Sequence, residues 1–433
     1  MHSEEQSLDL IRRQVPTFWK NPHLAGANQA LSSTPFTRAD FDEAHAMWPR
    51  FADLLVRLFP EADLASGQIE SPLLALAAPL PESITRRRST SVLVKADHSL
   101  PITGSIKARG AIYEVLLHAE SVALREGLLQ EGNNRAVLAG ERAARLFSGH
   151  SLIVGSTGNL GFSIGVIGRA LGFRVEVHMS SEAKAWKKAR LTALGARVVE
   201  HAGDYTSAVA AARGSACANP NAYFIDDENS DLLLLGYSSA APHFASQVKA
   251  MDIEPTPAAP LEVFLPCGVG GAPAGITLGL KMQYGDAARC IFVEPVASPC
   301  MLLQLMAGLD RLVSVYDFDL DNRTIADGLS VPRASLLAAQ TVRQLVDGVA
   351  TVSDESLLFW TAQLWHEAGM KLEPSAVAGF AAARAMEDGS YRPCARVIWT
   401  TGGSLLPDQE FQSLLDQAKQ VGRNDGFAAV SRN

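Results

Sequence analysis

Between residues 135 and 225, short apolar runs alternate with longer segments in which apolar residues recur at helical spacing. The short runs predict buried strands at 151–154, 174–178, 196–200 and 222–225, and the longer segments predict helices at 162–171, 183–194 and 205–216. In the helix at 183–194 the basic side chains are expected to face outward; these are Lys184, Lys187, Lys188 and Arg190. Strands that alternate with helices in this way indicate a parallel sheet with right-handed crossovers.

The same alternation resumes after a proline-rich break at 251–260. It predicts strands at 262–265 and 290–293, a helix between them that ends near Gln283, and a further strand at 396–399 in an otherwise helical tail. A short run at 91–95 also has the composition of a strand. The expected fold class is therefore α/β, with two domains that each contain an open, mostly parallel, twisted sheet flanked by helices.

The first 90 residues predict a helical N-terminal extension. Apolar residues recur at helical spacing from 39 to 59, and the pattern stops at Pro60. This segment shows no cluster of residues that could carry chemistry, so we expect it to pack on a large domain formed by residues 91–110 and 245–433. Residues 111–244 are expected to form a smaller domain.

Composition limits the kinds of partner. With 47% hydrophobic and 19% charged residues, the chain can bury a core, and its net charge of −8 argues against nucleic acid or an anionic membrane as the main partner. The five cysteines lie singly, without a CxxC pair, which indicates neither a disulfide framework nor a zinc site and favours a reducing cytoplasm. The N-terminus lacks the order of a signal peptide, and the longest apolar run, 73–80, is too short to span a bilayer.

The stretch Pro101-Ile-Thr-Gly-Ser-Ile-Lys-Ala-Arg-Gly110 places Lys107 at the start of a helix that is predicted from Ile106 to about His118. Ser105 is the candidate N-cap. A cation is disfavoured at the positive end of a helix, and the neighbours of Lys107 are largely apolar. A lysine shielded from water has a lowered pKa, so its free amine can act as a nucleophile or base. Taken alone, this pattern also fits a solvated lysine on a helix flank.

Two glycine-rich turns follow predicted strands. Gly155-Ser-Thr-Gly-Asn-Leu-Gly161 offers free N–H groups at a helix start, together with the side chains of Ser156, Thr157 and Asn159, which suits an anion. Pro266-Cys-Gly-Val-Gly-Gly-Ala-Pro273 repeats this arrangement after the strand at 262–265, and consecutive glycines let backbone amides approach phosphate oxygens.

A dinucleotide-binding fingerprint is the rival interpretation of the second turn. Gly268 and Gly270 follow a strand, and Glu294 closes the next one, as that fingerprint requires. However, the third glycine of the fingerprint is replaced by Pro273. A nicotinamide site would also leave Lys107 and the first turn without a role, so we favour a different cofactor.

Taken in order, a Ser-x-Lys loop, a Ser-x-Gly-Asn-x-Gly loop, a Gly-x-Gly-Gly loop and a late Thr-Gly-Gly turn resemble the fold type II pyridoxal-phosphate enzymes, the tryptophan synthase β family. Longer stretches are similar to the bacterial D-serine dehydratases (D-serine ammonia-lyases) within that family, and they cover almost the whole chain. They are Gly104-Ser-Ile-Lys-Ala-Arg-Gly110, Gly155-Ser-Thr-Gly-Asn-Leu-Gly161, Ala185-Trp-Lys-Lys188, Phe224-Ile-Asp-Asp-Glu-Asn-Ser230, Pro266-Cys-Gly-Val-Gly-Gly271 and Leu372-Glu-Pro-Ser-Ala376. Ala272, Ala274 and Ser404 depart from the pattern with small residues.

The resemblance implies a tryptophan synthase β-like fold in which the large domain binds pyridoxal 5'-phosphate. Lys107 would hold the cofactor as a Schiff base, Asn159 would contact its ring hydroxyl, and Thr401 would face its pyridine nitrogen. The phosphate would be bound by the backbone of Gly268, Val269, Gly270, Gly271 and Ala272. The substrate carboxylate would be bound by Ser156, Thr157 and Gly158. Glu294 has the position of a ligand for a monovalent cation such as K⁺, although a plain strand-end carboxylate explains it equally well.

The implied activity is that of a lyase of D-amino-acid metabolism. It would convert D-serine to pyruvate and ammonia, and D-threonine to 2-oxobutanoate, with Lys107, Thr157 and Asp227 as the expected catalytic residues. Asp226 and Asp227 both follow a predicted strand, and either could contact the substrate hydroxyl or only cap a loop. Asp227 is our hypothesis.

Other functions remain open at this stage. An L-serine/L-threonine dehydratase or a serine racemase would use nearly the same loops, and the residues alone do not give the chirality of the substrate. A binding protein that has lost the chemistry is a third alternative, but it would not require a buried amine at Lys107. The expected partner is a small amino-acid substrate, with no nucleic acid and no membrane. A monomer is expected because the N-terminal extension covers surface.

Overall fold

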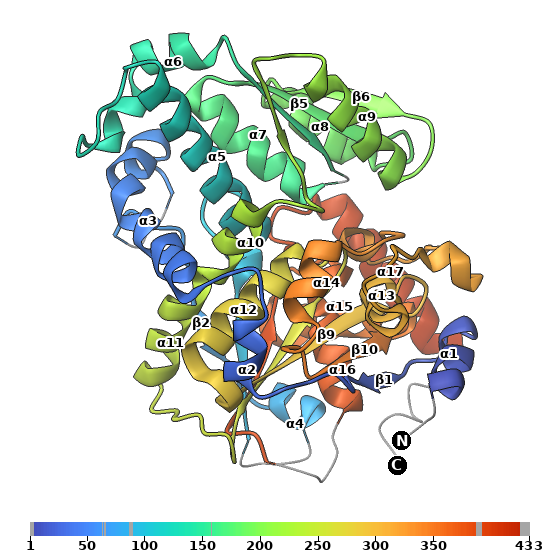
Figure 1. Ribbon diagram of the computed structural model, residues 1–433. Coiled ribbons are helices and arrows are strands. Elements are labelled where there is room, and N and C mark those ends of the chain that lie inside the picture. The colour runs from blue at the N-terminus through green and yellow to red at the C-terminus, as the bar shows by residue number, and fades with distance from the viewer. Residues whose placement is uncertain are drawn as a thin grey trace.

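The computed structural model describes residues 4–62, 64, 66–85, 90–156, 158–386 and 392–424. Its smaller sheet lies in the upper part of Figure 1 and has the order β6-β5-β4-β7, with every neighbouring pair parallel. These strands are β4 (Ser151–Gly155), β5 (Arg174–Ser180), β6 (Arg197–His201) and β7 (Ala222–Ile225). The crossovers between them contain α7 (Asn159–Leu171), α8 (Ala185–Ala193) and α9 (Tyr205–Cys217).

The larger sheet has seven strands in the order β1-β10-β9-β8-β11-β3-β2. They are β1 (Phe18–Lys20), β2 (Leu73–Ala75), β3 (Ser91–Lys95), β8 (Leu261–Pro266), β9 (Ala288–Pro295), β10 (Gly348–Val352) and β11 (Ala395–Trp399). The five inner strands run parallel, and only the edge strands β1 and β2 are antiparallel to their neighbours. The predicted fold class, mostly parallel sheets flanked by helices, is confirmed.

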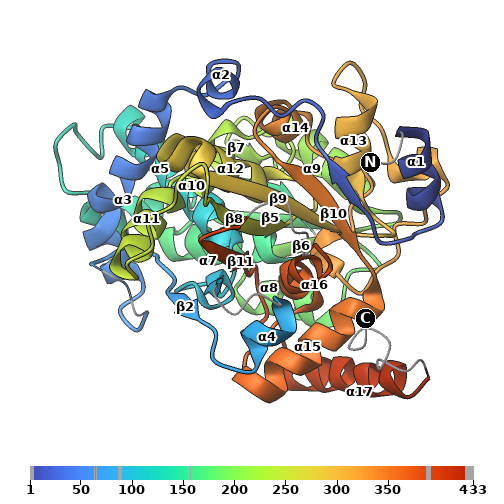
Figure 2. The ribbon, with the colours of Figure 1, turned by 90° about the horizontal axis from the view of Figure 1, so that it is seen from below.

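Helices cover both faces of the larger sheet, as Figure 2 shows. One face carries α4 (Leu80–Ile84), α15 (Asp354–Ala368), α16 (Ala378–Ala385) and α17 (Asp408–Asn424), and the other carries α2 (Ala27–Ser32), α12 (Gly271–Tyr284), α13 (Cys300–Ala307) and α14 (Leu336–Val342). Strands β8, β10 and β11 are buried along their whole length, as expected for a parallel sheet covered on both faces.

The N-terminal extension does more than the sequence predicted. Besides α1 (Glu4–Arg12) and α3 (Arg38–Leu58), it supplies β1 and β2, which form the two edges of the large sheet. The sequence analysis treated this segment as helical and irregular, and it also missed β10. Strands β1 and β2 are only three residues long, so their apolar runs are too short to stand out without the neighbours that bury them.

Helices α5 (Lys107–Arg125) and α10 (Asp231–Ser238) connect the two sheets in the centre of Figure 1. The domain borders proposed from the sequence, 110/111 and 244/245, fall inside α5 and inside α11 (Ala240–Ala250). Both helices continue across these positions. The proposed borders therefore fall within helices and not in loops.

Glycines let the central helices touch backbone to backbone. A β-carbon at Gly275 in α12 would lie 2.3 Å from the carbonyl oxygen of Leu234 in α10, and one at Gly279 would lie 2.3 Å from that of Ser238. A β-carbon at Gly236 in α10 would likewise lie 2.8 Å from the carbonyl oxygen of Arg109 in α5. Since α12 begins at the glycine loop and α5 begins at Lys107, these contacts set the distance between the two.

We predict that Gly275→Ala destabilises the protein, because its methyl group would press α10 away from α12. The expected cost is about 1–3 kcal/mol, as for other insertions into a packed core. The control is Gly214→Ala in α9, where a β-carbon would meet no atom within 4 Å and alanine is the better helix former. The check is the thermal unfolding midpoint. Two equally stable variants would contradict the close approach of the helices.

Candidate active site

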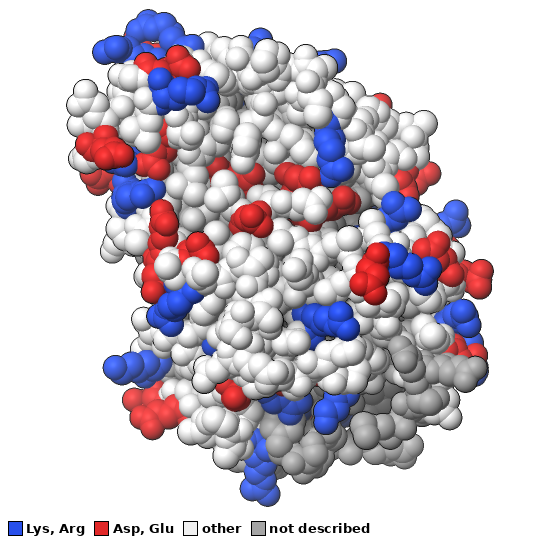
Figure 3. Space-filling model, viewed as in Figure 1, with Lys and Arg blue, Asp and Glu red and all other residues white. Residues whose placement is uncertain are grey.

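A cleft of about 750 Å³ lies where the carboxyl end of β4 in the small sheet meets that of β8 in the large one. Its walls include three backbone features: the lysine turn (residues 105–107), the asparagine turn (residues 155–156 and 158–161) and the glycine loop (residues 267–272). In Figure 3 acidic side chains gather along the boundary between the upper and lower halves of the molecule. Small-molecule sites of α/β proteins commonly occupy this position, outside the carboxyl ends of the strands.

Lys107 is the first residue of α5, and its side chain reaches the cleft with 22% of its surface exposed. Its Nζ lies 3.1 Å from Oδ1 of Asp227 and 5.8 Å from the centre of the Tyr237 ring. The prediction that Ser105 caps this helix was wrong. The N-cap is Ile106 and has no side-chain cap, while the buried Ser105 hydroxyl has no hydrogen-bond partner.

The glycine loop is built so that only glycine fits at its centre. Gly270 has a φ of 108°, which favours glycine, and a β-carbon there would lie 2.2 Å from the Met301 methyl group. Gly271 is the first residue of α12, so the unpaired N–H groups of the first turn point toward the cleft edge. Such a helix start attracts an anion.

The asparagine turn is held by its own serine. Ser156 Oγ accepts hydrogen bonds from the backbone N–H groups of Gly158 and Gly161, at 3.2 and 3.0 Å. Asn159 opens α7, and its Nδ2 donates to Glu373 on the large-sheet side of the cleft, at 3.1 Å. Thr157, a predicted catalytic and substrate-binding residue, lies outside the described residues.

Thr401 follows β11 and lines the cleft. Its carbonyl oxygen accepts a hydrogen bond from Ile106 N–H at 2.8 Å, which attaches the lysine turn to the end of β11. Its side-chain Oγ1 is buried and has no partner within the described protein. Buried hydroxyls are normally satisfied, so this one is available to a ligand.

The two neighbouring aspartates, which the sequence could not separate, take different directions. Asp227 lines the cleft and contacts Lys107, whereas Asp226 pairs with Arg213 at 2.8 Å and caps the backbone N–H of Glu228. The geometry therefore places the carboxylate of Asp227, and not that of Asp226, beside the reactive amine.

Glu294 is fully buried and does not line the cleft. Its two carboxyl oxygens accept the backbone N–H groups of Met301 and Leu302 in α13, at 2.8 and 2.9 Å. Burial raises the pKa of Glu294 to about 8, although these hydrogen bonds oppose the shift. Among the described residues, no cluster of three His, Cys, Asp or Glu side chains could hold a metal ion. In this structure Glu294 thus caps α13.

Four polar residues of the cleft were given no role from the sequence: Lys187, Tyr205, Glu373 and Ser375. Lys187 was predicted to face outward, but its side chain is only 9% exposed and forms an ion pair with Asp327. That prediction was wrong because helical spacing does not reveal what covers a helix from another part of the chain. Tyr205 begins α9 just after β6, so its place at the carboxyl edge of the sheet was a usable signal. Its buried hydroxyl has no partner.

The family model for pyridoxal-phosphate dependent enzymes matches residues 69–402. The chain belongs to this family. It is 46% identical over 437 residues to the probable D-serine dehydratase of Chromobacterium violaceum, covering 97% of each chain, and 45% identical over 438 residues to that of Pseudomonas putida strain F1, covering 97% of this chain and 98% of the relative. The predicted resemblance is thereby confirmed.

The fold is also that of solved relatives. Diaminopropionate ammonia lyase from Escherichia coli, in complex with an aminoacrylate-PLP azomethine reaction intermediate, superposes with a TM-score of 0.71 at 17% identity, over 93% of this chain and 97% of that one. The cleft fits pyridoxal phosphate. It offers one amine at a helix start, a glycine-lined helix N-terminus for a phosphate, and the unpartnered hydroxyl of Thr401.

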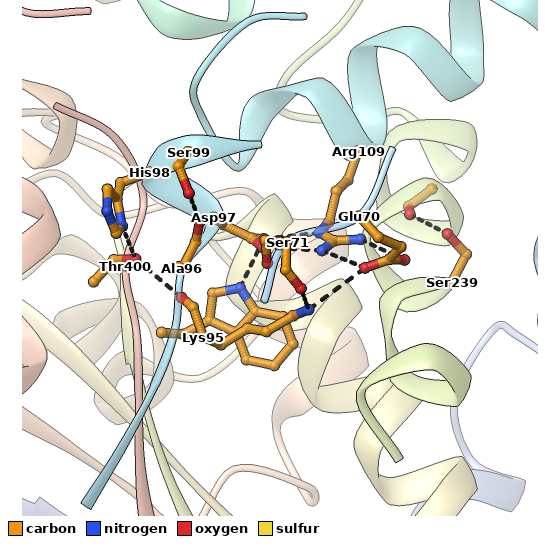
Figure 4. A network of polar contacts seen from close by, with 12 residues as sticks. Glu70, Ser71, Lys95, Ala96, Asp97, His98, Ser99, Arg109, Ser239 and Thr400 are labelled. Atoms are coloured by element: carbon orange, nitrogen blue, oxygen red, sulfur yellow. Dashed lines mark hydrogen bonds and ion pairs between the residues drawn. The ribbon is translucent and has the colours of Figure 1, made fainter. Parts of the chain in front are cut away.

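A buried ionic network surrounds Arg109, which lies two residues after Lys107 in the chain (Figure 4). Arg109 binds Asp97 through two hydrogen bonds of 2.7 and 2.9 Å and binds Glu70 through two of 3.1 and 3.2 Å. Burial disfavours the ionised carboxylates, but the charges of Arg109 and Lys95 and the hydrogen bonds to Arg109 together outweigh it and hold the pKa of Glu70 and Asp97 below their usual values.

The network joins four distant parts of the chain. Lys95, at the end of β3, contacts Glu70 and donates to the carbonyl oxygen of Ser71 at 2.6 Å, while burial lowers its pKa to about 8. Trp399, at the end of β11, donates to Asp97 at 2.8 Å. Glu70 and Ser71 belong to the N-terminal extension, which therefore supports the active site and does not merely cover the large domain.

We predict that Glu70→Gln destabilises the protein, because Arg109 and Lys95 would lose a buried counter-charge. Breaking one side of a buried ion pair typically costs about 3–5 kcal/mol. Asp42→Asn in the same extension is the control: its pair with Arg38 is exposed and contributes at most about 1 kcal/mol. Thermal unfolding midpoints test the contrast, and equal midpoints for the two variants would refute the role of Glu70.

Proposed function

We propose that this protein is a pyridoxal-phosphate dependent D-serine ammonia-lyase, which converts D-serine to pyruvate and ammonia and also converts D-threonine to 2-oxobutanoate. The observation that carries the proposal is the 46% identity, over 97% of both chains, to a probable D-serine dehydratase. The cleft supports it, because an amine and a carboxylate meet there beside an anion site at a helix start.

The residues around the cleft take distinct roles in this proposal. Lys107 holds the cofactor, the backbone N–H groups from Gly268 to Ala272 bind its phosphate, Asn159 contacts its ring hydroxyl, and Thr401 faces its ring nitrogen. When bound, pyridoxal phosphate supplies the electron sink that stabilises negative charge at Cα of the amino acid. Thr401 is a neutral hydroxyl and cannot keep that nitrogen protonated as a carboxylate would. The sink is therefore weaker, which favours rapid loss of a β-substituent.

The chain's own groups then move the protons. Lys107, displaced by the amine of the substrate, is the candidate that removes the Cα proton. Ser156, Thr157 and Gly158 bind the substrate carboxylate. Asp227, whose Oδ1 lies 3.1 Å from Lys107 Nζ, contacts the β-hydroxyl. The proton that Lys107 takes from Cα passes to this hydroxyl, which leaves as water. The enamine product released from the enzyme takes up water and yields pyruvate and ammonia.

The decisive test is the visible absorbance of the purified protein, followed by pyruvate detection with D-serine and then with L-serine. We expect a yellow protein that forms pyruvate from the D-enantiomer. Equal or greater activity on L-serine would transfer the proposal to an L-serine/L-threonine dehydratase, and interconversion of the enantiomers would transfer it to a racemase. A colourless protein that cannot be reconstituted with pyridoxal phosphate would refute the proposal.

Asp227→Asn should lower kcat/KM for D-serine by about 10²–10⁴-fold, the usual contribution of a positioned acid or base. The matched control is Asp226→Asn, which alters the adjacent carboxylate that pairs with Arg213 and should change kcat/KM by less than about 3-fold. Initial rates on D-serine and D-threonine provide the measurement. Full activity of Asp227→Asn on both substrates would remove Asp227 from the mechanism.

A cation, a cellular location and an assembly state complete the proposal. A monovalent cation at Glu294 would have to displace the N–H groups of Met301 and Leu302, and replacing K⁺ by tetramethylammonium in the assay tests for it.

A cytoplasmic location agrees with five free cysteines. No helix of the described residues is both long enough and apolar enough to cross a membrane. The proposed monomer is tested by light scattering.

A further inference from the structure

A second lysine enters the cleft from the small sheet. Lys187 lies in α8, and its side chain is only 9% exposed. Its Nζ forms an ion pair with Asp327, which begins the short 3-10 helix η5 (Asp327–Leu329) on the opposite side of the cleft. Removing a charged amine from water costs free energy, and a close counter-charge such as Asp327 offsets part of that cost.

The amine of Lys187 covers the asparagine turn. A β-carbon at Gly158 would lie 2.9 Å from Lys187 Nζ, so the absence of a side chain at Gly158 leaves the space that the amine occupies. Gly158 is one of the residues proposed to bind the α-carboxylate of the substrate. The amine therefore stands within contact distance of that subsite, and its charge faces the position of an incoming carboxylate.

The carboxylates near Lys187 leave its charge available. Asp327 is 38% exposed and is therefore partly solvated, so it can release the amine at a moderate cost. Glu373 also lies near, and burial raises its pKa while the charge of Lys187 opposes the rise. Asn159 already donates to Glu373. Among the described residues of the turn, the backbone N–H groups of Gly158 and Gly161 already donate to Ser156 Oγ. Among the described residues that line the cleft, the basic side chains are Lys107 and Lys187. Since Lys107 is assigned to the cofactor, Lys187 is the one that can offer a full positive charge to a carboxylate in the turn.

We propose that Lys187 is a specificity-determining residue that binds the α-carboxylate of the amino-acid substrate, and that Asp327 holds its amine in place before the substrate arrives. This inference rests on the proposed function. It predicts that substrates with a free carboxylate are preferred over neutral analogues because of one charge on α8.

The test compares Lys187→Met with Lys184→Met in the holoenzyme. Lys184 also pairs across to the large-sheet side, with Glu410 at 3.3 Å, but both partners are about 40% exposed, and it serves as the matched control. For Lys187→Met we expect KM for D-serine to rise at least about 10-fold with kcat within about 3-fold. The reason is that the lost contact would stabilise the bound substrate and the transition state equally. Lys184→Met should leave both constants unchanged. An unchanged KM in Lys187→Met would overturn the inference.

A neutral substrate separates charge recognition from simple support of the fold. The preference for D-serine over D-serinamide should fall about 10-fold or more in Lys187→Met, whereas a purely structural defect would lower activity on both and leave the ratio intact. Binding of D-alanine, which has no leaving group, is a readout independent of turnover: its dissociation constant, from the change in visible absorbance, should rise with KM. Lys187→Gln serves if the methionine variant does not fold.

The Asp327→Asn variant distinguishes two roles for Lys187. It could bind the substrate carboxylate, or its ion pair with Asp327 could only hold the two sides of the cleft together. If Asp327 only holds the amine, its loss should change KM for D-serine far less than loss of Lys187. Equal damage from both substitutions would show that the pair acts as a structural clamp and would overturn the inference. A wild-type protein that forms no pyruvate from D-serine would instead refute the proposed function, so the two failures are distinguishable.

Discussion

Arg109 and its two buried carboxylates hold the first turn of α5, and the position of Lys107 depends on that turn. The helix begins without a side-chain cap and with a cation at its positive end, which is locally unfavourable. Tertiary contacts compensate. Arg109 binds Asp97 and Glu70 below the turn, and Ile106 donates to the carbonyl of Thr401 at the end of β11. Removing either carboxylate would strand a buried charge.

Close helix packing extends this constraint to the rest of the site. Gly236 lets α10 touch α5, and Gly275 lets α10 touch α12, so the lysine turn and the glycine loop are held at a distance set by backbone contacts. The buried Glu114 of α5 accepts hydrogen bonds from Tyr223 in β7 of the small sheet and from Ser230, the N-cap of α10. Helix α5 therefore fixes the position of Lys107 relative to both sheets.

Much of the site was predictable from the sequence because its turns accept few residue types. Gly270 requires a positive φ and tolerates no side chain, and Lys107 follows a turn with little choice of residue, so both are visible in the sequence. Lys187 was predicted to be exposed because its helix is amphipathic, yet η5 covers it from a segment 140 residues away. For Glu294 the sequence left a cation ligand and a strand-end carboxylate equally open, and the structure shows its oxygens bound to backbone N–H groups at the start of α13. The spacing of apolar residues along a helix does not show which of its side chains a distant segment of the chain will cover.

The sequence by itself determined the alternation of strands and helices, the α/β class, the two glycine-rich turns and the family, because these depend on spacing and on residues that are nearly irreplaceable locally. The tertiary structure decided which charges meet. It paired Lys107 with Asp227 and turned Asp226 outward to Arg213, it placed Lys187 over Gly158, and it joined Glu70 to Arg109. These choices depend on which side chains are brought together out of water, where the strength of each charge interaction is set by burial and distance.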